Sequence, residues 1–162
     1  MKHFAALFTA LSFISMPALA QDAGQIEAVR DGKSCAACNL FQANLSYQDG
    51  EKMDLSNARL RQSNMALSTF NDMNLKGANL SVANLFGARF NRADFSGANF
   101  EHATAVGTYF GTSTLTGANL TGANFSGADL TLVKGLTQAQ LDQACGDPST
   151  RLPKGKTIPN CT

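Results

Sequence analysis

Tryptophan is absent from the sequence, and only 15% of the residues are charged. Apart from Lys2, which lies in a segment that we expect to be cleaved off, 12 basic residues balance 12 acidic ones. A neutral chain lacks the basic face that nucleic-acid binding favours, so we predict no nucleic-acid partner. No apolar run reaches the about 20 residues that a membrane span requires, and we predict no membrane span.

Groups suited to catalysis are equally scarce. His102 is the only histidine besides His3, so the many serine and threonine residues have no other candidate for a general base. No convergent partner for His102 is recognisable, and we interpret it as a solvated surface residue. We therefore predict no catalytic residue, no metal-binding or cofactor-binding residue, and no enzyme activity.

The first twenty residues have the pattern of a secretory signal peptide. Lys2 and His3 precede an apolar run that begins at Phe4, and the small-residue site Ala18–Ala20 follows Pro17. We expect cleavage before Gln21, where no cysteine is available to take a lipid. The sequence thus predicts a signal peptide over residues 1–20 and a soluble periplasmic or secreted protein.

Four cysteines, an even number in a chain expected to be exported, indicate disulfide bonds, and three pairings are open. We favour Cys35 with Cys38 and Cys145 with Cys161, because each pair is local and the pairs lie at opposite ends of the central segment. A four-cysteine zinc site commonly has two C-x-x-C pairs, and attachment of c-type haem requires histidine at the position of Asn39. A thioredoxin-like site requires a βαβ context, which is absent.

The central segment repeats every five residues, a period that neither an α-helix nor an ordinary strand produces. A large apolar residue occupies each position divisible by five from Leu40 to Leu130, with Gly50 and Ala105 as the only exceptions. Two positions earlier the residue is mostly alanine, and Asn or Asp commonly stands between the two. We expect a corner every five residues, with one large and one small side chain pointing inward.

Runs such as G-A-N-L-S and R-A-D-F-S resemble the pentapeptide-repeat family, whose pattern is A-(D/N)-L-x-x. The resemblance covers about Cys35 to Lys134 and implies an all-β solenoid, a right-handed quadrilateral β-helix of about five coils, stacked at the spacing of β-strands. Residues twenty apart should then lie over one another. We expect a ladder of Phe70, Phe90 and Phe110, contact between two oversized methionines, and an outer stack of alternating charges. The methionines are Met53 and Met73, and the charges are Lys52, Asp72 and Arg92.

The open ends of such a stack require caps. Ile26 and Val29 stand at helical spacing and predict a short amphipathic cap within residues 21–34, with the repeats over residues 35–134. Over residues 135–162 we expect a helix from Leu136 to Cys145, begun by Thr137 and stopped by Gly146, and then an extended tail held by the disulfide of Cys161.

The expected fold is a solenoid with short helical caps at the ends, and an apolar stripe on its outside is the candidate for a partner contact. It comprises Tyr47, Ala66, Leu67, Phe86 and Val106. Contiguous apolar patches often mark contact surfaces, although a cap or the C-terminal tail is an alternative cover. We predict an exported, non-enzymatic scaffold that mediates contact with an unknown protein partner, self-association or envelope structure. The alternatives are a DNA-mimicking, topoisomerase-binding protein, which the resemblance suggests, and an unrecognised envelope enzyme.

Overall fold

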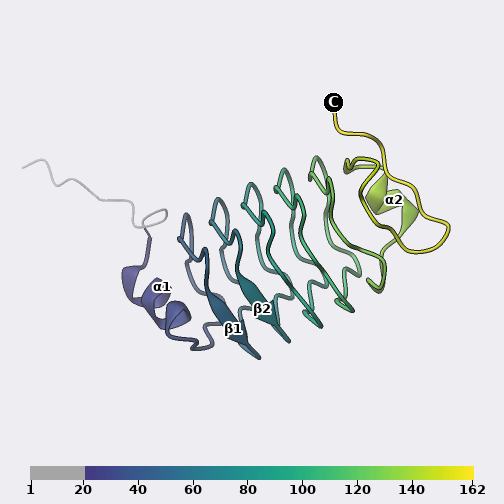
Figure 1. The fold of residues 1–162 in the computed structure, drawn as a ribbon. Coiled ribbons are helices and arrows are strands. Elements are labelled where there is room, and N and C mark those ends of the chain that lie inside the picture. The colour runs from purple at the N-terminus through teal and green to yellow at the C-terminus, as the bar shows by residue number, and fades with distance from the viewer. Residues whose placement is uncertain (1–20) are drawn as a thin grey trace, which may run out of the picture.

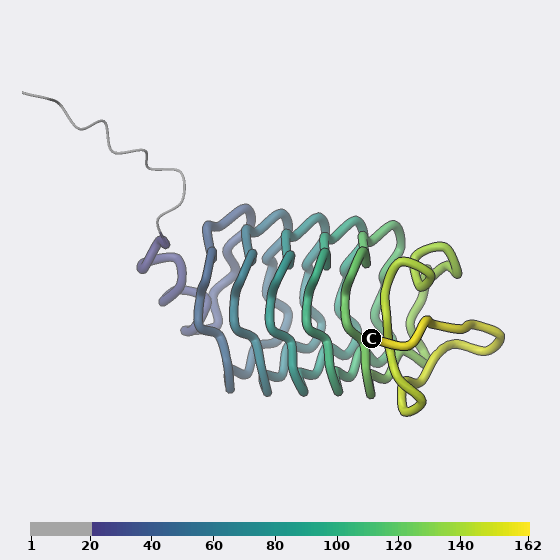
Figure 2. Tube along the Cα trace, turned by 90° about the horizontal axis from the view of Figure 1, so that it is seen from above, coloured from purple at the N-terminus to yellow at the C-terminus, as the bar shows by residue number. Residues whose placement is uncertain are grey.

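The computed structural model describes residues 21–162, and the expected signal peptide lies outside the described residues. The chain winds into a row of stacked turns between helix α1 (Ala23–Arg30) and helix α2 (Gln138–Leu141) (Figure 1). Figure 2 shows the same turns from above as a regular row that ends in the C-terminal tail. Parallel bridges join residues twenty apart, for example Asn79 with Asn99. This register makes each turn of four five-residue sides.

Regular strands are few because a corner follows almost every bridge. Within residues 21–162, only β1 (Asp49–Glu51) and β2 (Thr69–Asn71) are long enough to form strands, and they pair in parallel with Gly50 opposite Phe70. The other bridges of the stack each pair one residue per side. The expected solenoid is therefore present, but most of its β pairing consists of isolated bridges.

The corners depend on two different positions of the repeat. Asn44 accepts a hydrogen bond at Oδ1 from the backbone N–H of Ser46, 3.2 Å away, and the same bond recurs along the stack. Three residues after Asn44, Tyr47 adopts a φ of 58°, and many later turns have glycine at the equivalent position. The Asn and Asp residues thus bind the corner amides, whereas the unusual backbone angle falls on the residues that follow them.

The interior contains the side chains that the sequence predicted to be buried. All large apolar residues at positions divisible by five from Leu40 to Leu130 are at most 1% exposed. The ring centroids of Phe70 and Phe110 lie 6.0 and 6.1 Å from that of Phe90, which confirms the ladder. Each such side chain contributes about 1.5–3 kcal/mol on burial, and the contributions come mainly from neighbouring turns.

The two exceptions to the apolar series are compensated from elsewhere in the interior. At Gly50, the Met53 methyl group and the Phe70 ring occupy the space into which a side chain would extend; Phe70 Cδ1 would lie 2.9 Å from an added Cβ. Near Ala105, the Phe125 ring reaches Phe110, with 5.9 Å between centroids. Met53 and Phe70 thus fill the space at Gly50, and Phe125 joins the cluster of core rings in the turn after Ala105.

Helix α1 covers the first turn of the stack, as expected. Asp22 caps it by accepting a hydrogen bond from the N–H of Gln25 at 3.0 Å, and Ile26 and Val29 are buried. The Arg30 guanidinium donates to the carbonyl oxygen of Asn44 at 2.9 Å. The helix is therefore attached through both its apolar face and its C-terminal end.

The C-terminal segment differs from the prediction. Thr137 and Gln140 form a capping box at the start of α2, but the helix ends at Leu141 and does not reach Cys145. Cys145 instead bridges Asn124, and Arg151 bridges Asp129, so pairing with the stack continues beyond residue 134. Cys145 N–H donates to Ala123 O at 2.9 Å, a bond that a longer helix would have prevented.

The cysteines are paired locally at the two ends of the stack. Cys35 is bonded to Cys38, with 5.5 Å between their Cα atoms, and Cys145 is bonded to Cys161, with 4.8 Å between theirs. The second bond holds the end of the tail beside the last turns. This is the pairing that the sequence favoured.

Candidate functional site

The five residues of the predicted stripe lie together along one corner of the stack, which we call the apolar edge: Tyr47, Ala66, Leu67, Phe86 and Val106. Tyr47 is 74% exposed, Leu67 46% and Phe86 49%, whereas Ala66 and Val106 are partly buried. Tyr47, Leu67 and Phe86 thus expose large apolar side chains on three successive turns of one corner.

Backbone hydrogen bonds between turns set the spacing of the apolar edge. The Tyr47 N–H donates to Ala66 O at 3.1 Å, and the Leu67 N–H donates to Phe86 O at 2.8 Å. Leu67 also lies over Gly87, with its Cδ2 only 2.8 Å from where a Cβ of residue 87 would be. The missing side chain at Gly87 thus lets Leu67 pack against the next turn.

The C-terminal tail covers only the far end of this corner. The Asp147 carboxylate accepts from the Gly127 N–H at 3.0 Å, and the Ser126 hydroxyl lies 3.5 Å from the Cys161 sulfur. The exposed residues Leu67 and Phe86 lie on earlier turns. The tail is therefore not the cover of the apolar edge.

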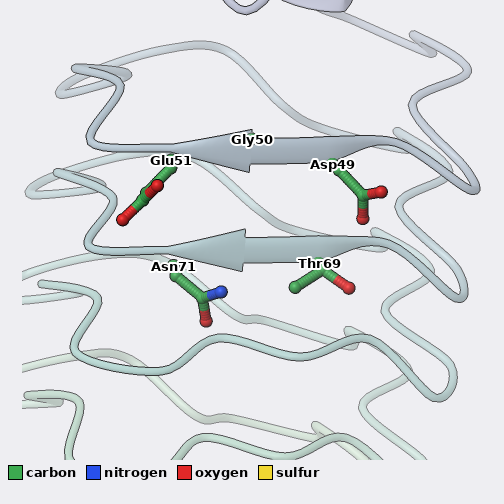
Figure 3. Close-up of a pocket in the computed structure, with 5 residues that line it drawn as sticks. All are labelled: Asp49, Gly50, Glu51, Thr69 and Asn71. Carbon is green, nitrogen blue, oxygen red and sulfur yellow. The ribbon is translucent and has the colours of Figure 1, made fainter.

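The wall that follows the apolar edge contains β1 and β2, and we call its outward side the β1–β2 wall. Its outward residues are Asp49, Glu51, Thr69, Asn71, Arg89, Asn91, Tyr109, Gly111, Asp129 and Thr131. A hollow of about 240 Å³ lies over β1 and β2, where Asp49 lies beside Thr69 at one end of the strands and Glu51 beside Asn71 at the other (Figure 3). A second hollow of about 270 Å³ lies farther along, lined by Tyr109, Gly111, Asp129, Thr131, Leu132 and Arg151.

The predicted charge stack borders this wall. Arg92 donates from Nε and Nη2 to the two Asp72 carboxylate oxygens, at 2.7 and 2.6 Å. These hydrogen bonds are the main cause that lowers the pKa of Asp72, and the charge of Lys52 adds to the effect. Arg92 and Asp72 therefore pair along the corner, whereas the Lys52 ammonium group lies 3.6 Å from the Glu51 carboxylate.

His102 lies exposed at another corner. Its imidazole is placed over Gly122, with Cε1 2.7 Å from the position of an added Cβ, so no polar side chain meets it there. Within residues 21–162, no three His, Cys, Asp or Glu side chains form a group that could hold a metal ion. The described part of the chain also has no helix with the length and apolar character needed to cross a membrane.

The repeat pattern matches a family of known proteins. The model for pentapeptide repeats fits residues 54–92 and 93–131, with eight copies. The chain is a pentapeptide-repeat protein. Members of this family form right-handed quadrilateral β-helices, and the bridges between residues twenty apart fit that fold. No curated protein is significantly similar in sequence.

Solved structures of other pentapeptide-repeat proteins resemble the chain. The protein Rfr23 from the cyanobacterium Cyanothece is 22% identical, with 80% of this chain and 95% of that chain covered and a TM-score of 0.31. A protein from the Arabidopsis thaliana thylakoid lumen is 26% identical over 70% of this chain and 75% of that chain, with a TM-score of 0.28. QnrB1, a plasmid-mediated fluoroquinolone resistance protein, is 16% identical over 79% and 87%, with a TM-score of 0.28.

Sequence reasoning missed the second hollow. Tyr109 precedes a core phenylalanine, in the position where the repeat commonly has Asn or Asp, and Gly111 follows that phenylalanine. Comparing each outward position with its equivalents twenty residues away would have singled out both residues. Arg151 could not have been found in this way, because the tail joins the stack with a different register.

Proposed function

We propose that this pentapeptide-repeat protein is an exported, non-enzymatic scaffold that binds a protein partner through the apolar edge. The observation that carries the proposal is the exposure of Tyr47, Leu67 and Phe86 on successive turns of one corner. Water contact with such a surface is unfavourable, and burial against a partner recovers about 25 cal/mol for each Å² of apolar area. The stacked turns present these side chains on a rigid support.

Leu67 lies at a corner position where later turns of the same corner have glycine. Leu67 has a φ of 56°, whereas the equivalent residues in the following turns, Gly87 and Gly107, have 61° and 65°. A residue with a side chain costs about 1–2 kcal/mol in this conformation, and glycine avoids that cost. Ten other residues with side chains in the described part of the chain, Val82 among them, adopt a similar angle, so the case for Leu67 as a contact residue depends on its exposure beside Phe86.

One feature of the structure fits export, and another disfavours DNA mimicry. Both cysteine pairs are bonded, which is usual for proteins of oxidising compartments. A DNA mimic needs an acidic face, whereas Lys52, Asp72 and Arg92 alternate in sign. Export is tested by fractionating the native cells and determining the mass of the protein: a soluble chain that begins at Gln21 is expected, and a full-length chain in the cytoplasm would contradict export.

The contact is tested by placing a photo-crosslinking amino acid at position 86 in the native compartment. We expect one discrete crosslinked product, absent when the amino acid is placed at Val82, whose exposure of 46% is close to the 49% of Phe86. Leu67→Ser combined with Phe86→Ser should abolish stable association in pull-down and sizing experiments. The matched control is Val82→Ser, because Val82 is 46% exposed at another corner. Unchanged association of the double variant would overturn the proposal, and a crosslinked dimer would identify the partner as a second copy.

A further inference from the structure

The second hollow on the β1–β2 wall exists because two residues depart from the repeat in the same turn. Tyr109 places an aromatic ring where the repeat commonly has Asn or Asp, and Gly111 removes the side chain that Asn71 and Asn91 supply in earlier turns. An added Cβ at Gly111 would come within 3.2 Å of Asn91 Cα. The Asn91 side chain lies in the space that a side chain at position 111 would take, with Cγ 3.1 Å from an added Cβ, and the hollow beside it is lined by Tyr109 and Asp129.

The polar groups of the hollow come from both the repeats and the tail. Asp129 accepts from the Thr131 N–H at 3.0 Å through Oδ1, and its Oδ2 lies 3.7 Å from Arg151 Nη1. Arg151 is held in place because its carbonyl oxygen accepts from the Leu130 N–H at 2.8 Å. The hollow therefore combines a carboxylate, a guanidinium and a hydroxyl group, and its net charge is zero.

The Tyr109 ring is fixed from the neighbouring turns. The Arg89 guanidinium carbon lies 4.8 Å from the ring centroid, a cation–π contact that restricts the ring. The Tyr109 N–H donates to Ala88 O at 2.9 Å, and Tyr109 O accepts from Phe90 N at 2.7 Å. Since Tyr109 also lines the hollow, a ligand there would meet a side chain that is already held in place.

We infer that this hollow binds one ring of a neutral saccharide. A sugar ring has an apolar C–H face that packs on an aromatic side chain and hydroxyl groups that both donate and accept hydrogen bonds. Carboxylate, guanidinium and hydroxyl groups at the hollow supply the complementary acceptors and donors. A charged ligand is less suitable, because Asp129 or Arg151 would face a like charge.

The rest of the β1–β2 wall suits a chain of such rings. Between the two hollows lie the outward side chains of Arg89 and Asn91, and the first hollow adds Thr69 and Asn71. All of these groups form hydrogen bonds with hydroxyl groups. An oligosaccharide bound at Tyr109 can therefore extend along the wall in the direction of the stack. This site is distinct from the apolar edge and goes beyond the proposed scaffold function.

Tyrosine fluorescence gives a direct test, because the chain has two tyrosines and no tryptophan. In the Tyr47→Phe variant, Tyr109 is the only strong emitter. The disulfide-intact protein is titrated with neutral tetrasaccharides of glucose, N-acetylglucosamine or mannose, and with a galacturonate tetramer as the charged comparison. We expect a saturable change in emission with at least one neutral tetrasaccharide and none with the charged one.

Variants made in the wild-type background, measured by titration calorimetry, locate the site. Tyr109→Asn restores the repeat residue and should weaken binding at least about tenfold, whereas Tyr109→Phe keeps the ring and should bind within about threefold of the wild type. Val82→Ser is the matched surface control, and circular dichroism verifies the fold of each variant. The inference is overturned if no neutral tetrasaccharide saturates the protein, if only the charged tetramer binds, or if Tyr109→Asn binds normally. The double variant Leu67→Ser with Phe86→Ser should retain saccharide binding. A failed saccharide-binding test can therefore be told apart from a failed test of the partner contact.

Discussion

The pairing of Gly50 with Met53 allows a double-mutant test of how the interior is filled. Met53 is 2% exposed, and its methyl group occupies the space that a side chain at position 50 would take. Met53→Ala leaves a cavity and should cost about 2–5 kcal/mol. Gly50→Leu alone forces a large side chain against Met53 and Phe70 and should cost about 1–3 kcal/mol.

The double variant, Gly50→Leu with Met53→Ala, restores the repeat residues at both positions, and we expect a cost below about 1 kcal/mol. The coupling free energy should therefore be at least about 2 kcal/mol in favour of the double variant. Urea unfolding followed by circular dichroism measures all four proteins, with equal m-values required for the comparison. Met73→Ala is the control, because Phe70 already fills the equivalent core position of that turn and Gly50→Leu should not rescue it. If the free-energy costs of Gly50→Leu and Met53→Ala simply add in the double variant, Met53 does not compensate for the missing side chain at Gly50.

Three further predictions concern the tail, the pH dependence and the corners. Replacing both Cys145 and Cys161 by serine opens a link between residues 16 apart and should lower the free energy of unfolding by about 3 kcal/mol, with faster proteolysis of the tail; equal proteolysis rates would contradict this. The pKa of Asp147 is lowered, chiefly by the Ser149 hydroxyl, so its carboxylate stabilises the fold above the ordinary pKa of about 4 and loses this effect as the pH falls below it. Asp147→Asn should accordingly lower the melting temperature at pH 7 but not at pH 2, and an equal effect at both pH values would argue against the ionised group. Gly117 has a φ of 66° with no atom within 4 Å of an added Cβ, so Gly117→Ala should cost about 1 kcal/mol in chemical denaturation, and a stabilised variant would contradict the role of glycine at this corner.

The sequence predicted the repeated part of the structure because one local rule determines it. A corner every five residues places residues twenty apart in contact, and this single relation accounts for the Phe70, Phe90 and Phe110 ladder. The same relation predicted the pairing of Asp72 with Arg92 and the gathering of the apolar edge. Periodicity gives long-range contacts here that an aperiodic sequence would not reveal.

The parts without a strict period were predicted less well. The segment from Leu136 to Cys145 has helix formers throughout, yet α2 ends at Leu141. Local propensity did not account for the hydrogen bonds that Cys145 gains by pairing with Asn124, at a separation of 21 residues. Pairing of Arg151 with Asp129 at 22 residues has the same cause, because the edge of the last turn accepts any backbone that can reach it.

A perfect repeat would present nearly the same surface on every turn, so a specific ligand must be recognised through departures from it. Leu67 keeps a side chain at a backbone angle that favours glycine, and Tyr109 replaces the usual Asn or Asp. Neither residue is needed to fill the interior, since both are at least partly exposed. The apolar edge with Leu67 lies along one border of the β1–β2 wall, and that wall carries Tyr109. Both proposed binding surfaces therefore lie on the same side of the stack, and each depends on side chains that the interior does not require.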